Sequence, residues 1–395
     1  MAQAAKPLWG MLGALIAGAA LSQAFRTAAT VMAGPLQAEL GLSAEALGVF
    51  SGAYHLSFAA LQLVMGVALD VYGPRRTVTV AFALAILGAL LSAFAPTYTA
   101  LVAGQLLIGA GCAPTFLAAM VFVANRYAVE RFTRLSGLVL ALSGVGMLIT
   151  ASPLAWVVEV WSWRAGFLAL AAGAAIAWLC TVLLVSAPPR PPDQGRETLV
   201  GAFREVGAIL AQKHTLGIIV LGAVTYAAFI TLRGLWVVPL LVERHDYTLL
   251  QSGHVVLALS LATLLGPPIF GRLDPGGAAR RFWIIGFTIG YALLFVLLAS
   301  GAPASFDVGA AVASGVLAGY IVLQYADVRT AYARKVMGRA FATFNTVVFL
   351  GVALMQWGSG VARSIDAAFV GIALVLAAGA VAFFLLPWPP GLRRT

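Results

Sequence analysis

The feature that most constrains this chain is a series of apolar stretches, each long enough to cross a lipid bilayer. We predict twelve spans, which cover residues 8–38, 44–69, 77–95, 99–123, 136–158, 164–186, 216–242, 250–271, 281–300, 307–327, 340–361 and 367–387. A helix needs about 20 apolar residues to cross a hydrocarbon core roughly 30 Å thick, and it satisfies its own backbone hydrogen bonds inside lipid. Because the alternating pattern of a transmembrane barrel is absent from the sequence, we predict an all-α integral membrane protein.

The composition and the longest polar break divide the chain into two parts. Hydrophobic residues make up 62% of the 395 residues and charged residues 10%, which is too apolar for a water-soluble fold. The break covers residues 188–213 and begins with several prolines, which favour a non-helical linker. We predict six-helix bundles over residues 1–187 and 214–395, joined by a cytoplasmic linker, 188–213, that contains a candidate amphipathic helix.

The charges are distributed unevenly between the two predicted sides of the membrane. The formal net charge is +10, and 19 of the 24 Lys and Arg residues fall in loops or tails on the side of the two termini. This positive-inside pattern predicts a multi-pass protein of the plasma (inner) membrane with both termini in the cytoplasm. It explains the basic character of the chain without a nucleic-acid partner.

No sequence pattern indicates a catalytic or cofactor centre. The sequence has no nucleotide-binding loop, no metal-ligand spacing and no nucleophile–base pair. We therefore expect no enzyme activity, no metal and no cofactor. The partners that we expect for a monomer of this kind are the lipid bilayer, a small-molecule substrate and, as a candidate coupling ion, the proton.

A charged loop motif follows the second predicted span. It reads Gly66-Val-Ala-Leu-Asp70-Val-Tyr-Gly73-Pro-Arg75-Arg76. Gly66 allows a neighbouring helix to approach, and Gly73 with the following proline makes a tight turn. Asp70 lies at a helix end where the dipole is negative, so it needs a facing cation or helix N-terminus. The motif resembles the G-x-x-x-D-x-x-G-x-R-R loop of the major facilitator superfamily.

This resemblance implies a secondary transporter with twelve transmembrane helices in two six-helix bundles, related by a pseudo-twofold axis and working by alternating access. It also implies a conformational gate on the cytoplasmic side, formed by Gly66, Asp70, Gly73, Arg75 and Arg76. A degraded copy of the motif follows the eighth predicted span and adds Asp274 to the gate. No subgroup is assigned, because Gln105 stands in the fourth span where proton-coupled drug exporters usually carry an arginine.

Two arginines lie deep inside predicted spans at matched depth, Arg26 about 18 residues into the first span and Arg233 about 17 residues into the seventh. An arginine in hydrocarbon costs at least about 2.5–3.5 kcal/mol, so it usually marks a functional site. The guanidinium fork binds carboxylate or phosphate groups. Paired arginines on these two helices are similar to the arrangement in organophosphate/phosphate antiporters and some organic-anion symporters. We therefore predict a small organic anion as substrate.

The candidate substrate-binding residues are polar or aromatic side chains predicted at a similar depth: Arg26, Arg233, Gln23, Thr30, Tyr54, His55, Gln105, Tyr226, Trp236, Tyr320, Gln324 and Asn345. Because no acidic residue lies in the middle of a predicted span, His55 is the candidate for proton coupling. The alternative is that both arginines bind helix carbonyls and that the protein exports a neutral or amphipathic compound. A membrane enzyme or a receptor without transport is a further alternative.

Overall fold

The computed structural model describes residues 8–126, 129–186, 199–332 and 337–388. The first part of the chain forms helices α1 (Leu8–Thr27), α2 (Ala29–Leu40), α3 (Ala44–Ala93), α4 (Tyr98–Cys112), α5 (Thr115–Arg126), α6 (Val129–Ile149), α7 (Ser152–Val160) and α8 (Trp163–Leu184). The second part forms α9 (Leu199–Leu210), α10 (Thr215–Thr231), the π-helix η1 (Leu232–Trp236), α11 (Val237–His245), α12 (Leu249–Leu273), α13 (Gly277–Leu298), α14 (Ala304–Ala318), α15 (Ile321–Ala331), α16 (Met337–Gly360) and α17 (Ile365–Leu385).

The helices correspond to the predicted spans. Among the described residues, 11 helical segments are long and apolar enough to cross a membrane. The remaining predicted span, 340–361, corresponds to α16, a helix of 24 residues that ends at Gly360. The predicted linker, 188–213, contains α9, whereas residues 187–198 lie outside the described part of the chain.

Four of the predicted spans are broken helices rather than continuous ones. The fourth breaks between α4 and α5, next to Pro114, and the fifth breaks before Pro153 in the first turn of α7. Proline has no N–H to donate and is tolerated at the start of a helix, so each proline ends one helix and begins the next. The tenth breaks between α14 and α15, and the first breaks beside Arg26, whereas the seventh continues past Arg233 through the π-helical turn η1.

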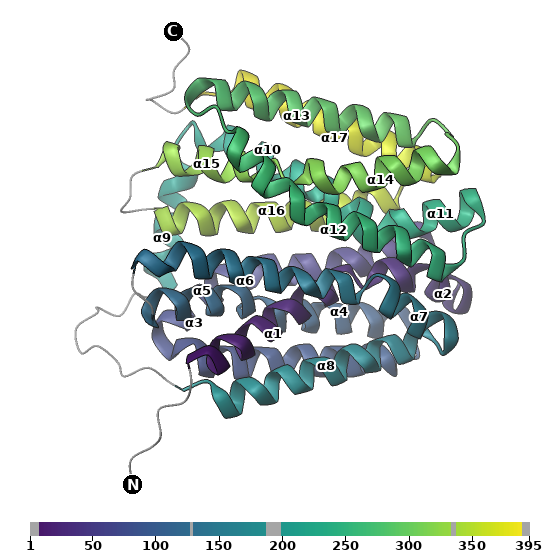
Figure 1. Ribbon diagram of the computed structural model, residues 1–395, viewed down its shortest axis with the longest axis horizontal. Helices are drawn as coiled ribbons and strands as arrows, with labels where there is room; N and C mark the ends of the chain where they lie inside the picture. The colour runs from purple at the N-terminus through teal and green to yellow at the C-terminus, as the bar shows by residue number, and fades with distance from the viewer. Residues whose placement is uncertain (1–7, 127–128, 187–198, 333–336, 389–395) are drawn as a thin grey trace.

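The helices form two groups that lie side by side (Figure 1). Helices α1 to α8 make up one group and α10 to α17 the other, and α1 begins at the same end of the molecule at which α17 ends. The groups meet where α3 packs against α16 and where α12 packs against α6 and α7. Helix α9 contacts α3 and α16 at the end where α1 begins.

Glycines allow the two groups to approach closely. A methyl group on Gly48 would lie 2.4 Å from the carbonyl oxygen of Gln356, and one on Gly52 would lie 2.8 Å from that of Ala353. On the other side of the interface, a methyl group on Gly253 would lie 2.8 Å from the Cβ of Ala155. Small residues of this kind bring helix backbones together in membranes.

These contacts lie toward the end that holds α2, α7 and α11, which we call the outer end because the charge distribution predicts that it faces away from the cytoplasm. Five helices that begin at this end have a Ser or Thr N-cap whose side-chain oxygen accepts a backbone N–H: Ser43, Thr97, Ser162, Thr248 and Ser364. Such caps satisfy donors that the first helical turn leaves free.

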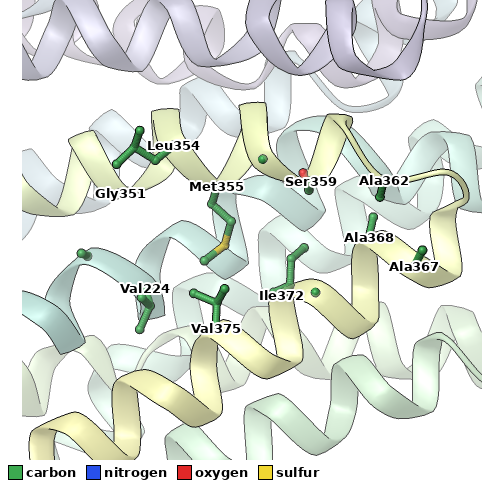
Figure 2. Close-up of a pocket in the computed structure, with 13 residues that line it drawn as sticks. Val224, Gly351, Leu354, Met355, Ser359, Ala362, Ala367, Ala368, Ile372 and Val375 are labelled. Carbon is green, nitrogen blue, oxygen red and sulfur yellow. The ribbon is translucent and has the colours of Figure 1, made fainter.

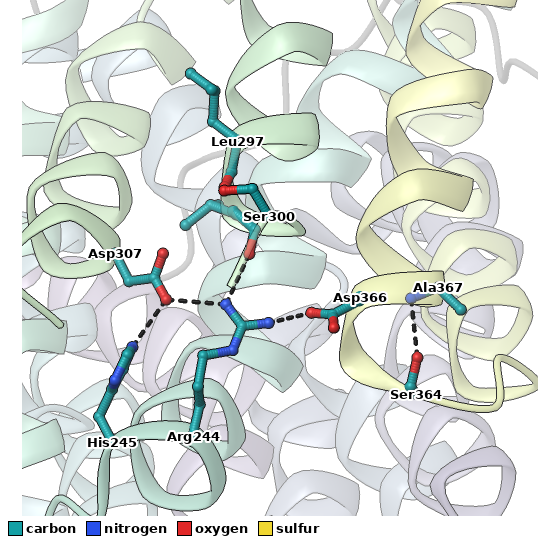
Figure 3. A network of polar contacts seen from close by, with 9 residues as sticks. Arg244, His245, Leu297, Ser300, Asp307, Ser364, Asp366 and Ala367 are labelled. Atoms are coloured by element: carbon teal, nitrogen blue, oxygen red, sulfur yellow. Dashed lines mark hydrogen bonds and ion pairs between the residues drawn. The ribbon is translucent and has the colours of Figure 1, made fainter. Parts of the chain in front are cut away.

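Hydrogen bonds and ion pairs at the outer end hold α2 and α11 within their own helix groups. In the first group, Trp163 Nε1 donates to Glu39 Oε2 at 2.7 Å, and Arg164 also pairs with Glu39. In the second group, Arg244 pairs with Asp307 and with Asp366, and His245 contacts the same Asp307 carboxylate (Figure 3). Arg244 also donates to the carbonyl of Leu298 at 2.8 Å. These contacts fix the ends of α2 and α11 against neighbouring helices of the same group.

Candidate functional site

The two arginine-bearing helices cross at the arginines. The hydroxyl of Thr30 donates to the carbonyl of Arg233 at 2.5 Å, and a methyl group on Gly234 would lie 3.8 Å from the carbonyl oxygen of Arg26. Both helices are irregular at this point, because α1 ends at Thr27 and η1 makes a π-helical turn. The structure therefore brings the two arginines to the same depth.

The side chain of Arg26 lies in an aromatic cage formed by Phe58, Tyr226 and Phe349. Its Cζ is 5.0 Å from the ring centroid of Phe58 and 4.5 Å from that of Phe349. Its Nη1 donates to the hydroxyl of Tyr226 at 3.4 Å, which is long for a hydrogen bond. Arg26 is buried, and its Nε has no hydrogen-bond partner among the described residues. Most of the donor capacity of this guanidinium is therefore unused by the protein.

The side chain of Arg233 takes a different direction and is fully buried. Its Nη2 donates to the carbonyl of Met147 at 2.6 Å and to the hydroxyl of Thr150 at 3.2 Å, and its Nε donates to Ser260 at 3.2 Å. Thr150 in turn shares a hydrogen bond of 2.7 Å with Thr27. Arg233 thus connects η1 to α6 of the other helix group, while Arg26 faces α3 and α16. Among the described residues, the two guanidinium groups share no hydrogen-bond partner in this conformation.

Several other predicted residues lie around the crossing. The hydroxyl of Tyr54 donates to the carbonyl of Ser22 at 3.0 Å, and the His55 imidazole contacts the carbonyl of Ser51 through Nδ1 at 3.2 Å. The Nε2 of His55 and the Oε1 of Gln23 are buried without a hydrogen-bond partner in the described part of the chain. Both side chains therefore keep unused hydrogen-bonding capacity.

The predicted residues of the second half divide into two sets. Trp236 Nε1 donates to Ser359 at 2.9 Å, and the partly buried Asn345 accepts a hydrogen bond of 2.6 Å from Tyr325, so both are bonded to α15 or α16 of their own group. Two others point into the core of their own group. The hydroxyls of Tyr320 and Thr288 are 3.1 Å apart, and the side-chain amide of Gln324 is hydrogen-bonded to Thr225 at 2.9 Å. Gln105 of α4 is buried.

The predicted gate residues occupy the turn inside α3 and its counterpart after α12. Gly73 has a φ of 78°, a conformation that favours glycine, and Arg75 donates to the carbonyl of Val182 at 2.8 Å. A methyl group on Gly66 would meet only a side-chain carbon of Leu117, at 3.7 Å, and Arg76 is exposed. The side chain of Asp70 lies outside the described part of the structure.

The second gate acid, Asp274, is held by an arginine. Arg280 donates to both oxygens of its carboxylate at 2.7 Å, and the backbone N–H of Gly276 donates to it at 2.9 Å. The hydrogen bonds from Arg280 lower the pKa of the Asp274 carboxyl below its ordinary value, because they stabilise the ionised form.

Sequence reasoning missed two features of the site and its surroundings. Phe58 and Phe349 were not candidates, because an aromatic residue in an apolar span carries no signal that separates a ligand cage from lipid-facing or core packing. The second is a buried ion pair in which Arg281 Nε lies 3.4 Å from Asp327 Oδ2. Asp327 is near the end of its predicted span, so its burial between α13 and α15 was not apparent from its position.

An apolar groove of about 390 Å³ lies between α10, α16 and α17. Met355 of α16 points toward Ile372 and Val375 of α17 across this groove, and Ser359 lies at its margin (Figure 2). The described residues that line the groove include no charged side chain. It can accommodate an apolar chain but offers nothing to neutralise an anion.

The chain matches known proteins over nearly its whole length. Residues 15–356 match the family model described as Major Facilitator Superfamily. The fold is similar to the crystal structure of a D-xylose–proton symporter, with 13% identity, a TM-score of 0.75 and coverage of 97% of this chain and 99% of that one. It is also similar to a bacterial homologue of the human lysosomal transporter Spinster in an inward-facing, occupied conformation, with 15% identity, a TM-score of 0.76 and coverage of 97% of both chains.

A nucleoside transporter has a similar fold as well, with 13% identity, a TM-score of 0.72 and coverage of 94% of this chain and 98% of that one. At these identities the likeness concerns the fold, and it confirms the predicted all-α membrane architecture of major facilitator type. The family match covers far more than half of the chain. The protein is therefore a membrane transporter and not an enzyme, and it belongs to the major facilitator superfamily.

Proposed function

We propose that this transporter carries a small organic anion by alternating access, and that Arg26 binds the anionic group. The observation that carries the proposal is a buried guanidinium with unused donors. Among the described residues, no Asp or Glu forms an ion pair with Arg26. A buried charge without a partner is unfavourable, so a site of this kind favours a ligand that brings the opposite charge.

The surroundings of Arg26 support access from the end where α1 begins. Gln23, Tyr226 and Asn345 lie toward that end and are only partly buried, whereas Thr30 and Arg233 on the other side are fully buried. The close contacts between the two helix groups lie toward the outer end. We therefore propose that the site opens to the cytoplasm in this conformation and to the opposite side in another.

The structure supports different proposed roles for the two arginines. Arg26 makes one long hydrogen bond, to Tyr226, whereas Arg233 makes three, to a helix carbonyl and two hydroxyls, and keeps only its Nη1 without a partner among the described residues. We propose that Arg26 is the primary anion ligand and that Arg233 joins the helix groups in this state. Direct binding of substrate by Arg233 would require another conformation in which these partners are released.

The experiment that tests the proposal measures binding and folding on the same samples. Wild type, Arg26→Lys and Arg26→Gln are purified, and their affinities for carboxylates, phosphates and neutral solutes are compared. Loss of one partner of a buried charge pair costs about 2–5 kcal/mol, or roughly 30-fold or more in affinity, so both variants are expected to lose anion binding. Lysine cannot reproduce the guanidinium fork. Arg164→Gln, which removes an arginine at the outer end, is the control.

Monodispersity of the same samples in detergent distinguishes an anion-binding role of Arg26 from a structural one. A monodisperse Arg26→Gln protein that binds anions with wild-type affinity contradicts the proposal. Loss of folded protein, with normal affinity in the fraction that remains, supports a structural role for Arg26 instead.

His55 is the proposed proton-coupling residue. It is fully buried next to Tyr54, and its Nε2 has no hydrogen-bond partner among the described residues. Histidine changes charge near physiological pH more readily than other side chains do. If protons are coupled to transport, His55→Gln should flatten the pH dependence of uptake in proteoliposomes between about pH 5 and 8. An unchanged profile contradicts this role.

A second candidate function is export of a neutral or amphipathic compound. Two observations favour it: Arg233 is engaged by groups of the protein, and the apolar groove between α10, α16 and α17 has no charged lining. This function predicts that neutral solutes bind at least as well as anions and that Arg26→Gln leaves their affinity unchanged. The same panel of solutes therefore decides between the two functions.

A further inference from the structure

The charge available at the site limits what the site can neutralise. Arg26 faces the aromatic cage, whereas Arg233 points toward Met147, Thr150 and Ser260. Each keeps one buried nitrogen without a hydrogen-bond partner among the described residues, Nε of Arg26 and Nη1 of Arg233. A ligand in the cage therefore meets one guanidinium, which balances a single negative charge. A phosphate monoester, with a second pKa near about 6, carries close to two charges at neutral pH and would leave one of them buried without a cation.

The walls of the site are aromatic. The rings of Phe58 and Phe349 meet edge to face at a centroid distance of 4.7 Å, and Tyr226 meets Phe349 edge to face at 6.0 Å. Tyr54 stacks on Phe58 at 5.8 Å and extends the surface along α3. Ring edges and faces of this kind pair favourably with a further ring in an offset or edge-to-face arrangement. The cage therefore suits a ligand whose uncharged part is apolar.

The Arg26 guanidinium is oriented so that the aromatic rings do not occupy its N–H donors. The rings of Phe58 and Phe349 contact the group at its Cζ, and neither takes up an N–H donor. Arginine binds a carboxylate through two parallel N–H donors in the plane of the fork. A carboxylate could reach this plane while an attached ring rests against the aromatic walls.

We propose that the substrate class is a monocarboxylate with an apolar, ring-bearing body. This inference rests on the proposed function of Arg26 and narrows it, since it assigns one negative charge and an apolar remainder to the transported anion. Phosphorylated substrates lie outside this class. They would suit a site in which Arg26 and Arg233 both bind the anionic group.

The test compares four probes that differ by one property each. Benzoate carries both the ring and a single charge, benzamide has the ring without the charge, acetate has the charge without the ring, and phenyl phosphate has the ring with a second charge. Dissociation constants are measured by titration calorimetry on the full-length protein in detergent near neutral pH. Benzoate is expected to bind at least about tenfold more tightly than each of the other three probes.

Two variants test which residue causes the preference for a charged group and which causes the preference for a ring. Arg26→Gln should remove the difference between benzoate and benzamide, because that difference depends on the charge. Phe349→Leu should reduce the preference for benzoate over acetate and leave the ratio of benzoate to benzamide nearly unchanged. The wild-type comparison alone remains decisive if a variant does not fold.

Each binding result with the wild-type protein tests one part of the proposal. Tightest binding of phenyl phosphate overturns the single-charge inference and leaves the anion function in place. Equal binding of acetate and benzoate overturns the apolar body. Equal binding of benzamide and benzoate contradicts the anion function itself, and the inference fails with it. Absence of binding by benzoate, while phenyl phosphate or acetate binds, also overturns the proposed substrate class.

Discussion

Replacement of Arg233 by methionine should shift the equilibrium between transporter conformations. Arg233 donates to Met147 and Thr150 in the first helix group and to Ser260 in its own group. Only the first two hydrogen bonds are lost when the groups separate at the outer end, so only they bias the equilibrium. Hydrogen bonds between membrane helices contribute about 0.6 kcal/mol on average and up to about 1.7 kcal/mol. Two of them predict a shift of roughly 1–3 kcal/mol, or about 5- to 150-fold.

The shift can be read from the accessibility of a cysteine at the closed outer contact. Ser51 is buried on α3 between Gly48 and Gly52, which lie against the backbone of α16. A Ser51→Cys reporter is placed in a background in which the two native cysteines are replaced by alanine. Its rate of labelling by a membrane-impermeant maleimide, applied from outside, should rise about 5- to 150-fold when Arg233→Met is added.

A second arginine at the end of the same helix provides the matched control. The partners of Arg244 are Leu298, Asp307 and Asp366, all within the second helix group. Arg244→Met should therefore lower the thermal unfolding midpoint without raising the labelling rate. Unchanged labelling in Arg233→Met would refute the assignment of Arg233 as a connection between the groups. An equal rise in both variants would show that any destabilisation exposes the reporter.

Two further predictions concern stability. Because Arg280 lowers the pKa of Asp274, this pair stabilises the folded state above the ordinary carboxyl pKa, and the contribution is lost as the pH falls through the lowered value. The difference in unfolding midpoint between wild type and Asp274→Asn should therefore narrow as the pH falls from about 6 to about 3, and a constant difference would contradict this. A methyl group on Gly146 would lie 1.7 Å from the carbonyl oxygen of Ala20, so Gly146→Ala should destabilise the protein by about 1–3 kcal/mol, whereas Gly290→Ala, with open space around it, should not. Equal thermal midpoints for the two glycine variants would refute the packing explanation.

The sequence predicts the spans well because lipid leaves few structural alternatives. A long apolar stretch in a bilayer must satisfy its backbone internally, so its length and hydropathy alone indicate a membrane helix. The breaks were not predicted, because their causes are local. Pro114 and Pro153 begin new helices, but the break after Thr27 involves no proline or glycine at that position. Tertiary contacts such as the hydrogen bond between Thr27 and Thr150 accompany it.

The depth of the arginines could be counted from the sequence, whereas the direction of their side chains could not. At about 1.5 Å per residue, similar distances into two spans predict similar depths. Direction depends on helical phase, and the π-helical turn η1 changes that phase, since Val237 donates to the carbonyl of Leu232 five residues earlier. The sequence also does not show whether a polar residue in a span faces a central site or the core of its own bundle. For this reason Tyr320 and Gln324 lie in the core of the second helix group although they were candidates for the site.

The different surroundings of the two arginines explain how one buried cation can remain available to a ligand. A carboxylate beside Arg26 would stabilise the empty site, but it would compete with an incoming anion for the same donors. The aromatic contacts from Phe58 and Phe349 are worth about 0.5–2 kcal/mol each and leave those donors free. Arg233 donates through Nη2 to neutral oxygens of another helix, which holds the helix groups together without a counter-charge. Matched depth in the two halves thus brings two arginines to one crossing, and the side chains around each decide whether it is poised for an anion or for the partner half of the transporter.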